Sequence, residues 1–366
     1  MILATVAVIG LSLAYLLQME YWRKLWLNEP IFEAETTIEE VRVSVIIPYR
    51  NEETNLKQLL DSLASQTYGN WELILVNDHS EDNGELICKQ YQSKIPVTVH
   101  LLNNTRHGKK EALKMGALKA NYELLVTSDA DCILQPNWLK TISHFYQKTK
   151  ADLIIGGVQL FSSNNKLGQF QVMEMAALQL SGAAAAISGK PIMMNGANMA
   201  CTKAFYLKAK LKTELASGDD MFLLEEAKRY NMKINYLKSP ESIVYSSVQK
   251  SFAQMLSQKA RWAAKAKSYS DKHIIKIGVL TFAMNLCLFA LIIGSFISPT
   301  ISVFLLGLIV IKLIADVRLL NSAYGYFAYP ICVKELLIGQ LLYPFYMLLV
   351  LIYPIFKPLK WKNRKV

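Results

Sequence analysis

Hydrophobic residues gather in blocks near the two ends of the chain, whereas the middle mixes short apolar runs with polar positions. Residues 2–17 form an uncharged apolar run, and three further blocks occupy 276–297, 299–315 and 335–356. A signal peptide would carry its positive charges before the apolar run, but here aromatic and basic residues follow it. This pattern predicts a membrane-spanning helix within residues 1–20, with the segment that follows it in the cytoplasm.

The middle of the chain, residues 42–240, predicts a soluble α/β domain that faces the cytoplasm. Short β-rich runs recur at 43–47, 73–76, 97–101, 124–127 and 153–158. Stretches with apolar spacing near 3.6 residues lie between the first four runs, as at 54–66 and 108–120. Strands that alternate with helices predict a mainly parallel sheet with its ligands at the carboxyl ends of the strands.

The C-terminal third predicts a membrane region. Residues 241–273 are amphipathic and basic, so we expect an interfacial helix, with an ordinary surface helix as the alternative. Residues 274–356 hold about three apolar segments, and a basic tail fills 357–366. Three crossings from the cytoplasm would leave this tail outside, whereas its charge favours the inside, so the topology of the last block stays open.

Composition narrows the class of partner. The 366 residues carry a net charge of +11 and are 52% hydrophobic. Because the basic residues are dispersed or lie beside apolar blocks, they indicate anionic lipids and phosphate-bearing substrates rather than nucleic acid. Five cysteines without a CxxC pair argue against a disulfide framework and against a zinc site, and they favour a reducing compartment.

Polar residues follow the first two predicted strands. The first leaves the sheet through Pro48 and reaches Glu52, a turn that can present backbone and carboxylate groups to a base or ribose. The second runs into Asp78, whose carboxylate suits a ribose hydroxyl or a base NH. Helix-capping turns are the alternative at both places. No GxGxxG follows the first strand, which argues against a dinucleotide-binding dehydrogenase.

The fourth predicted strand ends in two carboxylates, Asp129 and Asp131, separated by one alanine. Two acids just past a buried strand are costly unless a cation neutralises them. Mg²⁺ or Mn²⁺, bound by one or two carboxylates and by substrate phosphates, is the natural partner. The pair therefore predicts a metal-assisted site for a diphosphate.

Two further motifs carry candidate chemistry. Asp219 and Asp220 open a predicted helix, where carboxylates either cap the helix or raise one another's pKa and so suit Asp220 for general-base catalysis. Gln258, Arg261 and Trp262 share one helical face, with a guanidinium suited to phosphate and an indole suited to a sugar. An interfacial aromatic with snorkelling cations is the alternative.

Taken in order, these motifs resemble the membrane-bound branch of the family 2 glycosyltransferases, which includes hyaluronan, cellulose and ceramide sugar transferases. The matching segments are Ile46-Ile47-Pro48 with Asn51-Glu52, Val76-Asn77-Asp78-His79-Ser80, Gly108-Lys109, Asp129-Ala130-Asp131, Gly196-Ala197-Asn198, Gly218-Asp219-Asp220 and Gln258-Lys259-Ala260-Arg261-Trp262. The resemblance implies the GT-A fold, a Rossmann-like and mainly parallel sheet with helices on both faces, together with N-terminal and C-terminal transmembrane helices.

The resemblance also implies roles at the donor. Asp78 would contact the nucleoside and Lys109 the donor phosphates, with Pro48 and Glu52 in the donor-binding turn. Asp129 would contact the nucleotide and Asp131 the metal, Mg²⁺ or Mn²⁺.

At the acceptor end, Asp220 would be the catalytic base. Asp219, Gln258, Arg261 and Trp262 would shape the diphosphate and acceptor end. Asn77 and Gly218-Asp219 stand where the family often has acidic residues, which weakens any inference about the particular sugar.

The implied reaction is an inverting transfer from a nucleotide sugar, with a UDP-sugar expected, to a lipid-linked or growing saccharide acceptor at the membrane. The nearest alternative is a processive polysaccharide synthase. A membrane nucleotidyltransferase would usually show a Gly-rich basic loop after the first strand, and a non-catalytic scaffold would be expected to lose the paired acids or the base.

Overall fold

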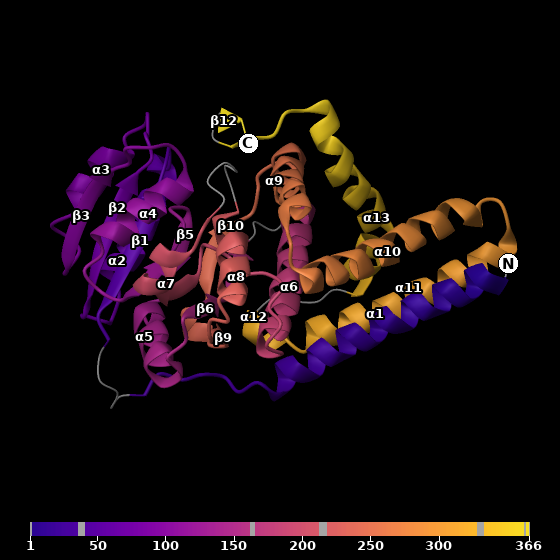
Figure 1. The fold of residues 1–366 in the computed structure, drawn as a ribbon. Coiled ribbons are helices and arrows are strands. Elements are labelled where there is room, and N and C mark those ends of the chain that lie inside the picture. Colours follow the sequence, from indigo (N-terminus) through magenta and orange to yellow (C-terminus); the bar gives the residue numbers. More distant parts are fainter. Residues whose placement is uncertain are drawn as a thin grey trace. The chain divides into compact units, whose positions relative to one another are not determined.

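The computed structural model describes residues 2–35, 41–161, 165–211, 218–327, 333–361 and 364–365. It contains two compact units, whose elements are labelled in Figure 1. The α/β unit comprises Pro30–Ser163, Met193–Val248 and Lys360–Val366. The helical unit comprises Met1–Glu29, Asn164–Ile192 and Gln249–Leu359. One segment inside the predicted 42–240 domain therefore packs with the helices.

A seven-stranded sheet forms the centre of the α/β unit, in the order β3-β2-β1-β4-β8-β6-β9. Its strands are β1 (Val43–Tyr49), β2 (Trp71–Asn77), β3 (Thr98–Asn103), β4 (Leu124–Thr127), β6 (Leu153–Gly156), β8 (Met199–Thr202) and β9 (Ile234–Leu237). The first four are parallel, and β8 runs antiparallel to both β4 and β6. The prediction of a mainly parallel sheet is confirmed.

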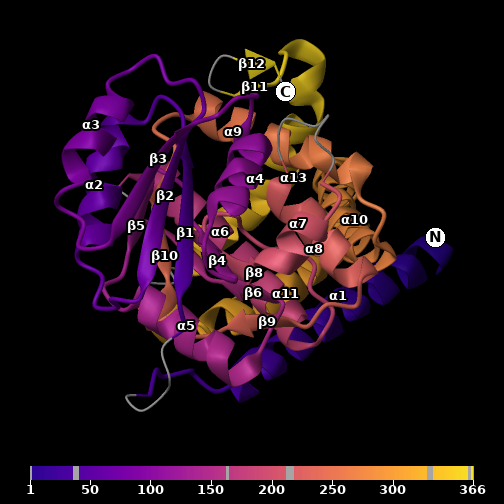
Figure 2. The ribbon, with the colours of Figure 1, turned by 60° about the vertical axis from the view of Figure 1, so that its left-hand side comes forward.

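Helices cover both faces of this sheet, and β1 is therefore buried along its whole length. Val45 and Ile47 share a hydrophobic core with the leucines of α2 (Glu53–Ala64). Ile46 points to the opposite face, where α4 (Lys109–Lys119) approaches so closely that a Cβ on Gly116 would lie 2.4 Å from it. Figure 2 shows α2 and α4 on opposite sides of the β1–β3 region. The two helices predicted at 54–66 and 108–120 are thus present, with slightly shorter bounds.

The predicted strand at 153–158 is two strands in two sheets. β6 ends at Gly156, and β7 (Val158–Phe161) joins a small sheet with β5 (Cys132–Leu134) and β10 (Val244–Ser247), in the order β5-β10-β7. At the junction, a Cβ on Gly156 would lie 2.4 Å from the Asn198 side chain, so only glycine fits. A continuous apolar run did not reveal this change of sheet.

The helices that complete the α/β unit are α3 (Gly84–Tyr91), α5 (Trp138–Thr149), α7 (Lys203–Lys208) and α8 (Asp219–Arg229), together with the 3-10 helix Pro240–Ser242. A two-stranded sheet of β11 (Lys360–Trp361) and β12 (Arg364–Lys365) comes from the C-terminal tail.

The helical unit contains α1 (Ile2–Asn28), α6 (Lys166–Ile187), α9 (Phe252–Lys265), α10 (Lys272–Ser295), α11 (Pro299–Asn321), α12 (Tyr324–Phe327) and α13 (Val333–Phe356), with the 3-10 helix Ala266–Ser268 after α9. The apolar run at 2–17 lies in α1. The blocks predicted at 276–297, 299–315 and 335–356 correspond to α10, α11 and α13. Residues 328–332, between α12 and α13, lie outside the described residues.

Two buried polar contacts tie these helices together. The Asp316 carboxylate on α11 accepts hydrogen bonds from the Tyr15 hydroxyl of α1 (2.7 Å), from Lys312 Nζ (2.6 Å) and from Gln340 Nε2 of α13 (3.1 Å). Lys259 Nζ on α9 lies 2.7 Å from Glu174 Oε2 on α6. Charges buried among helices are costly unless they are paired, and these carboxylates are paired.

Three helices among the described residues are long and apolar enough to cross a membrane: α6, α10 and residues Leu336–Phe356 of α13. They differ in how much protein covers them. The apolar window of α6 is 56% buried, whereas those of α10 and α13 are 22% and 28% buried. Protein therefore covers more of α6 than of α10 and α13, where few residues of the apolar window are buried.

Glu72 on β2 gives the α/β unit a pH-dependent contribution to stability. Burial alone would raise the pKa of this carboxyl, but hydrogen bonds from Ser44 Oγ and from both nitrogens of Asn121, each 2.6 Å long, outweigh burial and lower the pKa. Because the folded pKa lies below the unfolded one, this stabilisation is complete above about pH 4.3 and is lost as the pH falls through the lowered folded value.

We expect Glu72→Gln to lower the melting temperature of the detergent-solubilised chain at pH 7 by several degrees, since about 1–3 kcal/mol of charged hydrogen bonding is lost. The difference from wild type should shrink below about pH 4. The control is Glu85→Gln, which removes an exposed pair with Lys89. A Glu72→Gln difference that is constant with pH would contradict the assignment.

Candidate active site

The antiparallel strand β8 brings a distant segment to the carboxyl ends of the parallel strands. Because β8 pairs antiparallel with β4, its first residue, Met199, lies opposite Thr127, the last residue of β4. The segment that leads into β8 is held there by a hydrogen bond from Thr127 Oγ1 to the carbonyl oxygen of Gly196 (3.0 Å). Residues 196–198 therefore meet Asp129 at one edge of the sheet.

Lys109, the first residue of α4, lies between two acidic segments that are distant in sequence. Its Nζ is 2.6 Å from Asp129 Oδ1, just after β4, and 3.4 Å from Asp219 Oδ2, at the start of α8. Burial alone would lower the pKa of this ammonium, but Asp129 and Asp219 outweigh burial and raise the pKa well above its usual range. Lys109 is therefore a fixed positive charge at the centre of the site.

The two acids that open α8 have different surroundings. Gly218 adopts φ 88°, a left-handed conformation that glycine accommodates without strain, and the helix starts directly after it. Asp219 is buried and faces Lys109, whereas Asp220 is half-buried. Asp220 Oδ1 accepts the backbone N–H of Met221 at 2.8 Å. Both carboxylates also lie at the positive end of the helix dipole, which favours negative charge there.

Gly196 has no side chain, and this leaves room for the Lys109–Asp219 contact beside it. A Cβ at this position would lie 3.1 Å from Asp219 Oδ2, 3.2 Å from Lys109 Nζ and 3.8 Å from Asp220 Cβ. Any side chain at residue 196 would therefore press on the charged centre.

Asp129 and Asp131 offer carboxylate oxygens at the end of β4. The Asp129 side chain is 34% exposed beside Lys109, and Asp131 is exposed and accepts a weak hydrogen bond from Cys132 Sγ at 3.8 Å. Oxygen donors of this kind suit a hard cation such as Mg²⁺ or Mn²⁺, which takes one or two carboxylates and completes its shell with water and phosphate. The residues present thus fit the predicted metal.

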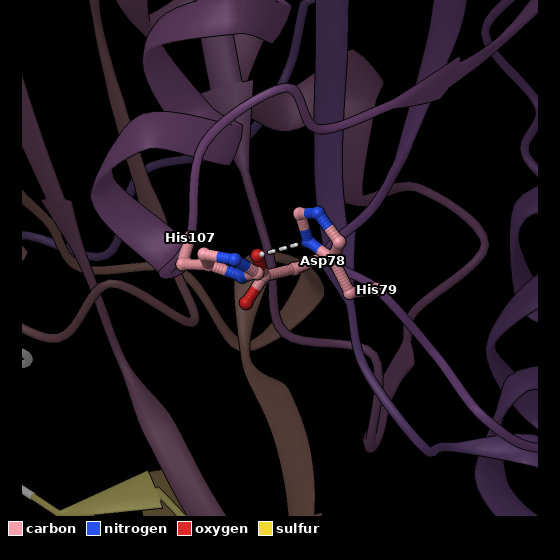
Figure 3. A group of neighbouring side chains, drawn as sticks. All are labelled: Asp78, His79 and His107. Atoms are coloured by element: carbon pink, nitrogen blue, oxygen red, sulfur yellow. Dashed lines mark hydrogen bonds and ion pairs between the residues drawn. The ribbon is translucent and has the colours of Figure 1, made fainter.

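Asp78 fixes the loop that precedes Lys109. Its buried Oδ1 accepts hydrogen bonds from Asn104 Nδ2 and from the backbone N–H of Gly108, each 2.9 Å long. Gly108 has φ 105°, which requires glycine, and Lys109 follows at once. His79 and His107 lie on either side of the Asp78 carboxylate in Figure 3. Asp78 therefore has the turn-stabilising role that sequence offered as the alternative, and its nucleoside contact stays a prediction.

Pro48 and Glu52 lie at the carboxyl end of β1, as predicted. Pro48 occupies the penultimate position of the strand, where it pairs with Val76 of β2. Glu52 precedes α2, and its Oε2 accepts a hydrogen bond from Asn55 Nδ2 at 2.7 Å. Their donor contacts stay predictions.

Gln258, Arg261 and Trp262 belong to α9 of the helical unit, and a regular helix places them on one face as predicted. Lys259, between them in sequence, lies 4.6 Å above the Trp262 ring and pairs with Glu174. Burial lowers the pKa of the Arg261 guanidinium, although an arginine in this range stays charged. Their roles toward a diphosphate or an acceptor stay predictions.

Asn198 is a structural residue whose role the sequence did not reveal. Its Oδ1 accepts from the Trp138 indole at 3.0 Å, and its Nδ2 donates to the carbonyl oxygens of Gly157 and Ser242, both at 2.7 Å. A buried amide with all of these contacts ties α5 to both sheets. His107 was also missed, because an isolated histidine in a loop carries no spacing signal.

Comparisons with known proteins identify two families whose models match overlapping parts of the chain, and relatives that match shorter stretches. The family described as glycosyl transferase family 2 matches residues 44–198, and glycosyl transferase family group 2 matches residues 124–356. The minor teichoic acid biosynthesis protein GgaB of Bacillus subtilis is 30% identical over 128 residues, which are 34% of this chain and 14% of that protein. The poly-beta-1,6-N-acetyl-D-glucosamine synthase of Staphylococcus aureus is 29% identical over 159 residues, 40% of this chain and 38% of that protein.

These matches span less than half of each relative. Among solved structures, the mannosyltransferase PcManGT from Pyrobaculum calidifontis, in complex with GDP-Man and Mn²⁺, has a TM-score of 0.58 at 17% identity. That similarity covers 97% of both chains and shows a shared fold.

The Lys109–Asp219 contact gives a prediction about stability. A double-mutant cycle of Lys109→Met and Asp219→Asn should show a coupling energy of about 1–3 kcal/mol, because either change removes the attraction between this ammonium and the buried Asp219 carboxylate, 3.4 Å away. The measurement is the free energy of unfolding from denaturant titration in detergent. The matched control is the exposed Glu85–Lys89 pair, expected to couple by less than about 1 kcal/mol. Equal coupling in the two cycles would contradict the central role of Lys109.

Proposed function

The chain belongs to glycosyl transferase family group 2, and we propose that it is an inverting enzyme that transfers a sugar from a nucleotide-sugar donor, expected to be a UDP-sugar, to a lipid-linked or saccharide acceptor at a membrane. That it is a glycosyltransferase follows from its family and its named relatives. The mechanism, donor, acceptor and place of action are proposals, since the chain spans only part of those relatives.

The observation that carries the proposal is the position of Lys109 between Asp129 and Asp219. One cation thereby joins Asp129, assigned to the donor, to Asp219, the neighbour of the proposed base Asp220. A diphosphate leaving group develops negative charge as its bond to the sugar breaks, and a preorganised ammonium stabilises that charge. Lys109 is already held in place before the donor arrives.

Asp129 and Asp131 are the residues that would hold Mg²⁺ or Mn²⁺ with the donor diphosphate. The bound ion would supply a second positive charge against the leaving diphosphate. PcManGT, which shares the fold, is in complex with Mn²⁺. Asp131 is exposed and accessible to an incoming metal–donor complex, whereas Asp129 already contacts Lys109.

Asp220 is assigned the proton transfer. Its half-buried carboxylate takes the proton from the acceptor hydroxyl while the hydroxyl oxygen forms a bond to the anomeric carbon. The bond from that carbon to the diphosphate oxygen breaks in the same displacement, and the electron pair leaves with the nucleoside diphosphate. A single displacement inverts the anomeric centre and forms no covalent glycosyl-enzyme.

Membrane action is supported by the outward faces of the long helices. Exposed apolar side chains form rows on α1 and α10: Leu3, Val6, Leu13 and Leu17, and Ile275, Val279, Phe282 and Leu286. Apolar rows of this length are stable against lipid and costly against water. We place the α/β unit on the cytoplasmic side, because aromatic and basic residues follow the apolar part of α1.

Asp220→Asn should reduce transfer by at least about a hundredfold, because the acceptor hydroxyl loses its base. Nucleoside diphosphate binding should stay close to wild type. Asp219→Asn, one residue away, is the contrast, since it disturbs Lys109 and should weaken nucleoside diphosphate binding as well.

The measurement for Asp220→Asn is incorporation of radiolabelled sugar into products separated by size. Normal turnover by Asp220→Asn would refute the base assignment. The wild-type product sizes also separate single addition, which we favour, from the processive synthesis suggested by the poly-N-acetylglucosamine synthase relative.

Asp131→Ala should remove the gain in UDP affinity that Mn²⁺ confers, because a direct metal ligand is lost. In calorimetric titrations with and without Mn²⁺, we expect wild type to bind UDP at least about tenfold more tightly with the metal, a difference of about 1.4 kcal/mol. Glu85→Ala removes a surface carboxylate and should behave as wild type. A metal effect that is unchanged in Asp131→Ala would rule out this residue as a ligand.

A further inference from the structure

Asp78, His79 and His107 bring one carboxylate and two imidazoles together at the carboxyl end of β2 (Figure 3). Asp78 and His79 follow the strand directly, and His107 comes from the loop between β3 and α4. One ligand atom from each residue lies within 4.8 Å of the others. We propose that these three side chains form a second metal site, one that binds a transition-metal dication such as Zn²⁺.

The ligand atoms of this cluster favour a particular kind of metal. Zn²⁺ is commonly bound by histidine nitrogens and a carboxylate oxygen, and three protein ligands leave a fourth position open. Asp129 and Asp131 offer only oxygen atoms, which favour Mg²⁺ or Mn²⁺. The absence of a CxxC pair argued against zinc, but this cluster uses no cysteine. The chain therefore presents two sites that differ in their preferred metal.

One distance in the cluster matches the spacing of two ligands around a bound ion. His79 Nδ1 and Asp78 Oδ1 are 3.4 Å apart, close to the spacing of about 3.3–3.4 Å that two ligands have around a tetrahedral zinc with bonds of about 2.0–2.1 Å. The rings of His79 and His107 are 4.0 Å apart at 35°. Both histidines are exposed, so their side chains can rotate by the remaining distance.

Asp78 also has the outer contacts that a metal ligand requires. The hydrogen bonds from Asn104 and Gly108 fix its carboxylate, and such partners orient ligands in metal sites. His79 adopts φ 59°, a left-handed conformation that is uncommon outside glycine and more frequent in His, Asn and Asp. Two hydrogen bonds thus fix the Asp78 carboxylate, and the two histidines are exposed to solvent.

A metal here would join the end of β2 to the loop that leads into Lys109. His107 is two residues before Lys109, and Asp78 already holds Gly108 between them. Occupancy of this site would therefore restrain the segment that positions the central ammonium. This consequence for transfer rests on the proposed function, whereas metal binding itself does not.

Calorimetric titration of the purified full-length chain with Zn²⁺ tests the site. We expect His107→Ala to weaken one Zn²⁺ site by about tenfold or more. Asp78→Asn should weaken it too, while its amide oxygen still accepts the hydrogen bonds from Asn104 and Gly108. The matched control Arg106→Ala removes the exposed neighbour of His107 and should bind Zn²⁺ as wild type.

Two results would overturn the proposal. One is wild-type Zn²⁺ affinity in His107→Ala. The other is loss of the same Zn²⁺ site in Asp131→Ala, which would place the ion at the acids after β4.

The nucleoside role of Asp78 is tested separately by UDP. If Zn²⁺ and UDP compete, the metal and the nucleoside share Asp78. If Zn²⁺ binds through His107 and UDP affinity does not change, the metal site stands and the nucleoside contact that the resemblance implies for Asp78 is wrong.

Discussion

The arrangement of the active site depends on one charged contact, Lys109 between Asp129 and Asp219. Three elements of the α/β unit start or end at this contact: β4 ends before Asp129, α4 begins with Lys109, and α8 begins with Asp219. Without the ammonium, two carboxylates would face one another in a partly buried site, which is unfavourable. The ion pair therefore allows the acids to gather and sets the charge at this end of the sheet.

The sequence was sufficient to predict which residues follow the parallel strands. It was insufficient to predict which residues, distant in sequence, contact them there. Asp78 and Asp129 follow β-rich runs that alternate with helices, and the carboxyl ends of parallel strands meet at one edge. Gly196 arrives at the same edge only because β8 is antiparallel, and a four-residue strand leaves no pattern that fixes its direction. The Lys109–Asp219 contact spans more than a hundred residues, a distance at which local periodicity carries no information.

The helical unit shows the same division. The predicted apolar blocks lie largely within α1, α10, α11 and α13, but α1 and α11 continue beyond their blocks, to Asn28 and Asn321. Which of those helices contact one another could not be predicted from the sequence, since the contacts depend on polar side chains that are distant in sequence. Asp316 is the example: its carboxylate joins α1 and α13 to α11, yet in sequence it is one acid just past an apolar block, and nothing there indicates its partners.

Asp78 shows why structural and functional interpretations of one residue need not exclude one another. As a turn residue it accepts the Gly108 N–H and so places Lys109, and this part of its role requires only a hydrogen-bond acceptor. The two flanking histidines add ligands that a turn does not require, which is why the cluster indicates a metal. The asparagine variant separates these roles, because an amide preserves the acceptor and removes the charge that favours a dication. Asp78 holds the loop through Gly108, and Lys109 follows at once. A ligand bound to the Asp78 carboxylate would therefore act on the segment that places the Lys109 ammonium.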